Sequence, residues 1–284
     1  AVAELGVGAL VAGSRNLVDA VNWAQTLKGR DTIAKDVEKG KKAFVGPELR
    51  GKTLGVIGLG AIGARVANAA VALGMEVLGY DPYISIDAAW NLSRTIKHSK
   101  SLDEIYSQCD YITIHVPAMD STKGMIDKNA IGLMKDGVVI LNYARNVLVD
   151  EEAVVDALVS GHVKNYVTDF PTPIVAGVKG AIITPHLGAS TEESEDNCAK
   201  MAVAEVRNYL ENGNIQHSVN YPDCDMGVKG ENTRITLLHH NVPNMIGQFT
   251  KILADDNMNI ADMTNKSKGE NAYTMIDIDS DVTD

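Results

Sequence analysis

The chain lacks any excess of basic residues. Its 284 residues include 26 lysines and arginines against 37 aspartates and glutamates, which gives a formal net charge of −11 at pH 7. Nucleic acids and anionic membrane surfaces bind to a cationic face, so this balance argues against both as general partners. A local basic pocket for a small anion remains compatible with it.

Long apolar runs and cysteines are scarce as well. No uncharged apolar run approaches the roughly 18 residues of a membrane span. Glu4 interrupts the apolar start and no basic segment precedes it, so a signal peptide is not expected either. Cys109, Cys198 and Cys224 form no CxxC pair. They predict neither a disulfide framework nor a metal site, and they favour a reducing, cytoplasmic location.

What is present indicates a folded protein of about two domains. Apolar residues make up 45% of the chain and charged residues 22%. From Lys52 onward, short β-rich runs alternate with helical stretches. The expected strands are residues 52–59, 75–81, 111–117, 137–144, 166–170 and 180–186. Such runs with helices between them predict a Rossmann-type, doubly wound α/β fold with a parallel sheet.

The remainder of the chain has a different pattern. A helix is expected up to about residue 212, and glycine and proline then break regular structure over residues 213–230, the best linker candidate. A strand at 233–240, a helix at 243–256 and a hairpin at 259–279 follow. This β-α-β-β order predicts a small α+β, ferredoxin-like module.

A glycine motif follows the first expected strand and opens a helix. Gly58 permits a tight turn, Gly60 lets the backbone approach a pyrophosphate, and Gly63 lets helix and strand pack closely. The helix start, with Ala61 and Ile62, offers free N–H groups to phosphates. The motif therefore predicts a dinucleotide-binding turn.

Asp81 ends the next expected strand, eighteen residues after Gly63. A carboxylate there accepts hydrogen bonds from the ribose hydroxyls and repels a 2′-phosphate, which favours NAD over NADP. Pro82 and Tyr83 follow, and neither binds such a phosphate. The alternative is a glycine turn of some other α/β protein with an unrelated acid nearby.

Four motifs in order carry a resemblance to a known family. With VIGLGAIG at 56–63, HVP at 115–117, LNYAR at 141–145 and TPHLGAST at 184–191, the chain resembles the D-2-hydroxyacid dehydrogenases. It is most similar to the branch that begins serine biosynthesis and carries a C-terminal ACT module. The resemblance implies an NAD-dependent oxidation of a small phosphorylated 2-hydroxy acid by a homo-oligomer.

The same resemblance implies a division of the chain. Residues 1–187 would form the NAD-binding domain, residues 188–222 the returning part of a substrate-binding domain with a linker, and residues 231–284 part of an ACT domain. On this basis we expect a fragment. It would lack the N-terminal part of the substrate-binding domain and the end of the ACT module.

Two residues are candidates for the chemistry. Oxidation of a hydroxyl beside a carboxylate needs a base, and His186 qualifies because histidine exchanges protons near working pH. It also needs a cation for the carboxylate, and the planar fork of Arg145 suits that role. A satisfied core histidine, and a surface arginine paired with Asp150, are the alternatives.

The resemblance also assigns the remaining cofactor contacts. Asp169 is expected to face the nicotinamide carboxamide, and residues 184–189 to line the nicotinamide pocket. The full set implied beyond the glycine turn is His115, Val116, Pro117, Ala144, Asp169, Gly188 and Ala189.

One departure from the family pattern concerns His186. The family pairs this histidine with a carboxylate on the preceding loop, yet residues 170–185 contain no Asp or Glu. We therefore expect a less firmly oriented ring and reduced turnover. A glyoxylate or hydroxypyruvate reductase of the same family, and a non-catalytic NAD-sensing relative, remain open as functions.

The last module has candidate effector residues. By resemblance, a serine effector would contact His239, Asn241 and Asn259. Imidazole and amide groups can bind both ends of a zwitterion without net charge. The alternative is that they are ordinary turn residues.

Overall fold

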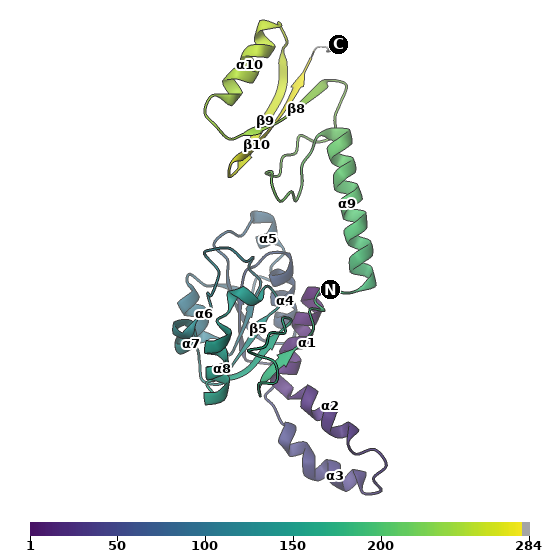
Figure 1. Ribbon diagram of the computed structural model, residues 1–284, viewed down its shortest axis with the longest axis vertical. Coiled ribbons are helices and arrows are strands. Elements are labelled where there is room, and N and C mark those ends of the chain that lie inside the picture. Colours follow the sequence, from purple (N-terminus) through teal and green to yellow (C-terminus); the bar gives the residue numbers. More distant parts are fainter. Residues whose placement is uncertain (280–284) are drawn as a thin grey trace. The chain divides into compact units, whose positions relative to one another are not determined.

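The computed structural model describes residues 1–279, apart from the side chain of Asp87. The chain divides into two compact units, Ala1–Thr191 and Glu192–Asp284 (Figure 1). The last residues of the predicted α+β module, 280–284, lie outside the described part. Within it, no helix combines the length and the apolar sequence that a membrane crossing requires.

The first unit is built on one parallel sheet of seven strands in the order β3-β2-β1-β4-β5-β6-β7. The strands are β1 (Thr53–Ile57), β2 (Glu76–Tyr80), β3 (Lys97–His98), β4 (Tyr111–Ile114), β5 (Val138–Asn142), β6 (Val163–Thr168) and β7 (Ala181–Ile183). The order reverses between β1 and β4. A parallel sheet with such a switch point is the doubly wound fold, so the predicted fold class is confirmed.

Helices cover both faces of this sheet (Figure 1). The helices packed on the sheet are α1 (Val2–Arg15) and α4 (Ala61–Ala72), and α6 (Leu102–Gln108), α7 (Lys128–Leu133) and α8 (Glu151–Ser160). The short α5 (Ile86–Trp90) follows β2, whereas α2 (Leu17–Gln25) and α3 (Ile33–Gly40) have no buried residue and extend away from the sheet (Figure 1). One apolar cluster joins α1 and α4 to the strands, and another joins α6, α7 and α8 to them. Because both faces are covered, β4 and β5 are buried along their whole length.

The first helix packs unusually close to the sheet. A Cβ on Gly13 would lie 3.0 Å from Val139 and 3.1 Å from Val167, so glycine permits the approach. The buried amide of Asn165 donates to the Gly13 carbonyl at 2.6 Å. β6 begins at Val163, earlier than the predicted residue 166, where it pairs with Val138 of β5, and α1 supplies a partner for the polar Asn165 within it.

Several elements of this unit were not predicted from the sequence, among them α2, α3, β3 and α5. The strand β3 has only two residues, Lys97 and His98, and both are exposed. The helix α5 has five residues and begins at a Ser85 side-chain cap. Neither β3 nor α5 is long enough to show an apolar period, which is the signal on which sequence prediction depends.

His162 directly precedes β6 and forms two contacts at the amino end of the sheet. Its Nε2 contacts the Ile131 carbonyl oxygen at 2.9 Å and its Nδ1 contacts the Asp136 carboxylate at 2.5 Å. Both partners are acceptors, so the ring binds them best when both nitrogens carry protons. The Ile131 carbonyl, followed by Asp136, raises the pKa of His162 above its usual 6.5.

We expect the stability that His162 contributes to depend on pH. With a folded pKa above the unfolded one, the contribution is fully present below about pH 6.5 and is lost as pH rises through the folded pKa. The difference in unfolding free energy between wild type and His162→Gln should therefore shrink as pH rises from about 6.5 through the folded pKa. Urea titrations measure it, and Asp136→Asn should weaken the pH dependence. A constant difference over that range would contradict the assignment.

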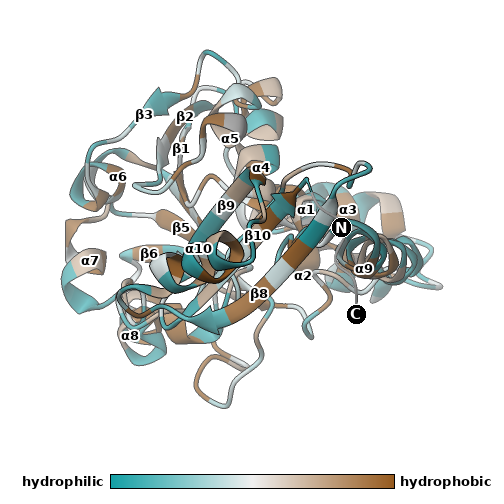
Figure 2. Cartoon of the chain, turned by 90° about the horizontal axis from the view of Figure 1, so that it is seen from above, coloured by the Kyte–Doolittle hydropathy of each residue, from teal (hydrophilic) through white to brown (hydrophobic). Residues whose placement is uncertain are grey.

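The second unit has a long helix and a small antiparallel sheet. Its elements are α9 (Glu192–Asn212), β8 (Thr233–His240), α10 (Met245–Asp255), β9 (Ile260–Lys268) and β10 (Asn271–Ile278). The sheet order is β8-β10-β9. Hydrophobic and hydrophilic residues alternate in bands along β8 (Figure 2). The predicted β-α-β-β order is thus observed.

The segment predicted as a linker, residues 213–230, has no helix or strand but is packed. Ile215 and Cys224 form an isolated antiparallel bridge and are buried with Tyr273 and Met275 of β10. Arg234 joins this segment to the sheet by donating to the carbonyls of Met226 and Gly227. The segment therefore belongs to the core of the second unit.

Candidate functional site

The glycine turn between β1 and α4 is shaped by close backbone contacts. Gly58 has φ +92°, and a Cβ there would lie 2.7 Å from the His115 carbonyl oxygen. A Cβ on Gly63 would lie 1.9 Å from the Gly58 carbonyl oxygen. Both positions therefore require glycine for steric reasons.

Gly60 differs from its two neighbours in the motif. A Cβ on Gly60 would meet no atom within 4 Å, so the space beside it is open. Gly60 is also the N-cap of α4, and no side chain caps that helix start, which opens with Ala61 and Ile62. The N–H groups of an uncapped helix start beside open space can hold an anion. These features fit the pyrophosphate of a dinucleotide.

Asp81 lies directly after β2 and is tied to this turn. Its carboxylate accepts from the N–H of Leu59 and from the N–H of Tyr83, both at 2.9 Å. Pairing of Ile57 with Tyr80 sets the two strand ends side by side. The predicted ribose acceptor is thus held at the edge of the predicted phosphate cradle.

The loop after β4 borders the same turn from the other side. The Nε2 atom of His115 lies 2.9 Å from Oγ1 of Thr113, and burial lowers the pKa of His115 to about 4. Its Nδ1 is buried without a hydrogen-bond partner among the described residues. The side chain of Val116 would lie 3.0 Å from a Cβ on Gly58, and the exposed Pro117 follows. At neutral pH this histidine is a neutral group.

Arg145 follows β5 in a turn that Asn142 organises. The Asn142 amide donates to the Arg145 carbonyl at 2.9 Å, and its oxygen accepts from the N–H of Ala144 at 3.2 Å. The Arg145 guanidinium is exposed and donates to the Ala144 carbonyl at 2.6 Å. Among the described residues no ion pair engages it, and Asp150, the alternative partner, instead caps α8 by accepting from the N–H of Ala153.

His186 follows β7 in a turn centred on Asp169, which follows β6. The Asp169 carboxylate is buried and accepts from Thr184, from the N–H of Leu187 and from the N–H of Gly188. The loop continues through the exposed Ala189. The His186 imidazole is exposed, and the Phe170 ring lies with its centroid 5.2 Å away.

No described carboxylate contacts the His186 ring. Neither the hydrogen bonds nor the ion pairs of the described side chains join that imidazole to an Asp or Glu. Asp169 therefore does not replace the carboxylate that residues 170–185 lack, because its two oxygens face Thr184 and the backbone of the turn. A sequence cannot show which atoms a carboxylate faces.

The candidate residues of the first unit thus gather at one edge. The turns after β1, β2, β4, β5, β6 and β7 hold all of them, and in a parallel sheet these carboxyl ends meet at the same edge. Ligands of open α/β sheets bind at that edge, beside the switch point between β1 and β4. Asn142 and Thr184 were missed as organising residues. A polar residue at the end of an apolar strand was the available signal.

The three effector candidates do not form one cluster in a single copy. His239 pairs with Ala272 at the start of β10, and Asn241 contacts Gly269 nearby. Asn259 precedes β9, whose first residue pairs with Ile278 at the other end of β10. The two ends lie six residue steps apart along β10, which corresponds to about 20 Å.

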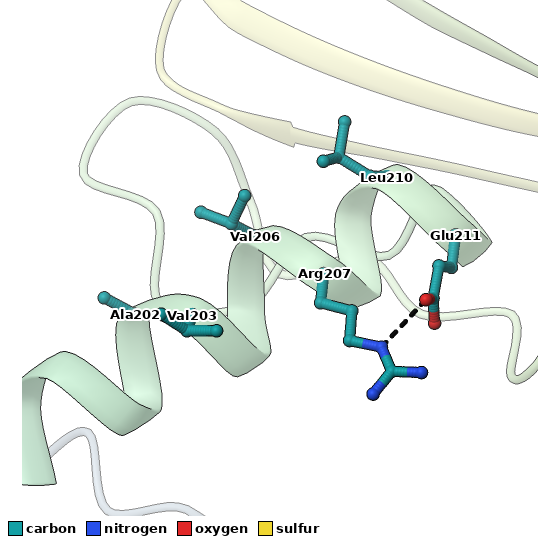
Figure 3. A pocket seen from close by; sticks show the side chains of 6 residues that line it. All are labelled: Ala202, Val203, Val206, Arg207, Leu210 and Glu211. Carbon is teal, nitrogen blue, oxygen red and sulfur yellow. Dashed lines mark hydrogen bonds and ion pairs between the residues drawn. The ribbon is translucent and has the colours of Figure 1, made fainter.

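The helix α9 has an uncovered apolar side. None of its described residues is buried, and Val203, Val206 and Leu210 are 68%, 58% and 75% exposed. Figure 3 shows Val206 and Leu210 on one side of the helix, while Arg207 reaches toward Glu211 on another. Apolar side chains at this spacing are typical of a helix face that packs against another element.

Comparison with known proteins points to one family. Residues 7–188 match the family described as D-isomer specific 2-hydroxyacid dehydrogenase, NAD binding domain. The chain is 34% identical to D-3-phosphoglycerate dehydrogenase of Methanocaldococcus jannaschii over 87% of its length and 46% of the relative's. It is 32% identical to the Escherichia coli K12 protein of that name over 82% and 58%. The chain thus spans about half the length of these relatives.

Solved structures give the same fold. D-lactate dehydrogenase from Aquifex aeolicus, complexed with NAD and lactic acid, is 29% identical with a TM-score of 0.61, over 74% of this chain and 66% of that one. A glyoxylate reductase from Paecilomyes thermophila is 27% identical with a TM-score of 0.62, over 77% and 64%. Both likenesses extend over most of the chain.

Proposed function

The chain belongs to the family of D-isomer-specific 2-hydroxyacid dehydrogenases through its NAD-binding domain, and on that premise we propose that it takes part in oxidising 3-phospho-D-glycerate to 3-phosphohydroxypyruvate. This is the first step of serine biosynthesis. The observation that carries the proposal is the single sheet edge that holds the glycine turn, Arg145 and His186. The relatives named D-3-phosphoglycerate dehydrogenase support the choice of substrate.

Each part of that edge has a role in the proposal. NAD, when bound, supplies a nicotinamide C4 that accepts a hydride. Gly60 and the start of α4 would hold its pyrophosphate, and Asp81 its ribose hydroxyls. The other predicted cofactor residues would line the rest of the NAD site. They are Gly58, Ala61, Ile62, Gly63, His115, Val116, Pro117, Ala144, Asp169, Gly188 and Ala189.

The substrate is oxidised by loss of one proton and one hydride. His186 takes the proton of the substrate hydroxyl while the hydrogen on the same carbon leaves as hydride, and a carbonyl forms. Arg145 binds the neighbouring carboxylate through its two parallel N–H groups. The absence of a described carboxylate at His186 favours, as a second candidate, an NAD-sensing protein without turnover.

The proposed function also requires a substrate-binding domain and contacts between copies of the chain. We propose that residues 188–222 comprise the returning part of a substrate-binding domain and a linker to the second sheet, and the uncovered apolar side of α9 supports the first of these. We propose a cytoplasmic homo-oligomer, supported by three free cysteines and by Leu17, Val18 and Val21 of α2, which are 45–49% exposed. Because the residues of an ACT-type serine site lie at both ends of β10, that site would be shared between two copies.

Binding of reduced cofactor tests the proposal. NADH should bind with an increase in its fluorescence, and NADPH should bind at least about tenfold more weakly, which corresponds to about 1.4 kcal/mol. Asp81→Asn keeps the shape of the side chain but removes the charge that repels a 2′-phosphate. It should therefore bring the affinities for NADH and NADPH closer together. Equal affinities of wild type for the two cofactors would contradict the role of Asp81, and no NADH binding would refute the function.

A turnover assay then separates the candidates. Absorbance of reduced nicotinamide should rise when the protein is mixed with NAD and 3-phosphoglycerate. A faster reaction with NADH and glyoxylate would favour the reductase. Binding of NADH without turnover of either substrate would favour the sensor.

A further inference from the structure

The buried carboxylate of Asp169 holds the turn that presents His186. Asp169 is 2% exposed and follows β6, next to the strand that leads into the turn. Its Oδ1 accepts from the Thr184 hydroxyl at 2.5 Å and from the Leu187 N–H at 2.8 Å, and its Oδ2 accepts from the Gly188 N–H at 2.7 Å. Its own carbonyl accepts from the His186 N–H at 2.9 Å. Asp169 thus bonds to four residues of the loop.

The turn needs such support because its backbone is strained. His186 has φ +57°, in the left-handed region that costs a residue other than glycine about 1–2 kcal/mol. Hydrogen bonds from N–H groups to an ionised carboxylate are short and roughly twice as strong as neutral ones. Two such bonds come from Leu187 and Gly188, the residues directly after the strained position. They offset the strain where it arises.

From these contacts we propose that Asp169 is the positioning residue for the His186 imidazole, acting through the backbone turn in place of a carboxylate on the ring. The inference rests on the function proposed above. The turn fixes the direction in which the side chain leaves the backbone. The Phe170 ring, 5.2 Å from the imidazole and tilted by 60°, then limits its rotation. Phe170 follows Asp169 directly, so one short segment holds both the turn and the ring.

A contact between Asp169 and the cofactor is compatible with this role. A carboxylate has about four acceptor sites, and the loop uses three of them. The two roles differ in when they appear. Positioning of His186 operates in the protein without cofactor, whereas a nicotinamide contact requires it.

The experiment observes the His186 ring in the cofactor-free chain. In a carbon–proton NMR spectrum of the seven histidines, His186→Gln identifies the His186 signals, and Phe170→Leu measures how far the Phe170 ring shifts them. Asp169→Asn places an amide donor against an N–H donor of the turn. We expect it to remove most of the Phe170-dependent shift and to broaden the His186 signals, with the other six histidines unchanged.

Thr184 provides a matched pair of variants. Thr184→Val removes the hydroxyl that donates to Asp169 and should move the His186 signals in the same direction as Asp169→Asn. Thr184→Ser keeps the hydroxyl and should restore them. If Asp169→Asn fails to fold, the Thr184 pair decides alone. His186 signals that stay at their wild-type positions in Thr184→Val and in any folded Asp169→Asn overturn the proposal.

The test is independent of the proposed function. NADH titration of the wild type is run beside the spectra. Failure of NADH to bind refutes the function but leaves the ring signals to decide the role of Asp169. Normal NADH binding with unmoved ring signals refutes the positioning role alone.

Discussion

Replacing Arg234 with Met is expected to lower the free energy of unfolding of the second unit by about 3–5 kcal/mol, the cost of breaking a buried ion pair by removing one partner. The Arg234 side chain is 4% exposed, and it donates to both carboxylate oxygens of Asp277 at 2.7 and 2.8 Å. It also donates to the carbonyls of Asn212, Met226 and Gly227. The substitution leaves one carboxylate and three carbonyls without this donor.

Two buried cysteines allow each unit to be followed separately. Cys224 is fully buried in the second unit, and Cys109 is fully buried in the first. A thiol reagent reaches either side chain only when its unit opens, so labelling rates report local stability. Arg234→Met should label Cys224 about 10²- to 10⁴-fold faster, the rate equivalent of this free energy, and leave the Cys109 rate unchanged.

Arg207 is the matched control for Arg234. It forms an ion pair with Glu211 at 2.8 Å on the surface of α9, where the two side chains are 72% and 55% exposed. Exposed ion pairs on a helix contribute little to stability, because solvent screens the two charges. Arg207→Met should therefore leave Cys224 labelling within about threefold of wild type. Equal effects of the two substitutions on Cys224 labelling would mean that burial does not increase the contribution of the Arg234 pair to stability.

The parallel sheet was predictable because its strands are short apolar runs separated by helices. β4 and β5 are buried on both faces, so nearly every residue in them is apolar and the pattern is visible without neighbours. The start of β6 was not predictable for the opposite reason. Lys164 and Asn165 are polar, and Asn165 is accepted inside only because Gly13 of a distant helix offers a carbonyl.

The candidate site also has a part that was predictable from the sequence and a part that was not. The glycine motif, Asp81, Arg145 and His186 stand directly after strands, so their common edge follows from the fold. The direction of the Asp169 carboxylate does not follow, because it depends on three hydrogen bonds with residues fifteen or more positions away. The separation of Asn259 from His239 also required strand register, which the residue types do not encode.

Substitutions in the glycine turn are expected to have the second large effect, and Gly63→Ala and Gly60→Ala should differ in its kind. A Cβ on Gly63 would lie 1.9 Å from the Gly58 carbonyl oxygen, a backbone atom that cannot rotate away. Gly63→Ala must therefore move α4 away from β1. We expect it to lower the free energy of unfolding of the first unit by about 1–3 kcal/mol or more and to abolish NADH binding.

Gly60→Ala should separate binding from stability, because its Cβ meets no protein atom within 4 Å but occupies the open side of the cradle. We expect NADH affinity to fall by at least about tenfold while the unfolding free energy changes by less than about 1 kcal/mol. Gly132→Ala, in α7 and equally free of neighbours, controls for adding a methyl group to a helical glycine and should leave NADH affinity unchanged. If Gly60→Ala binds NADH as tightly as wild type, the phosphates do not approach the backbone at Gly60, and the turn between β1 and α4 is not the cradle.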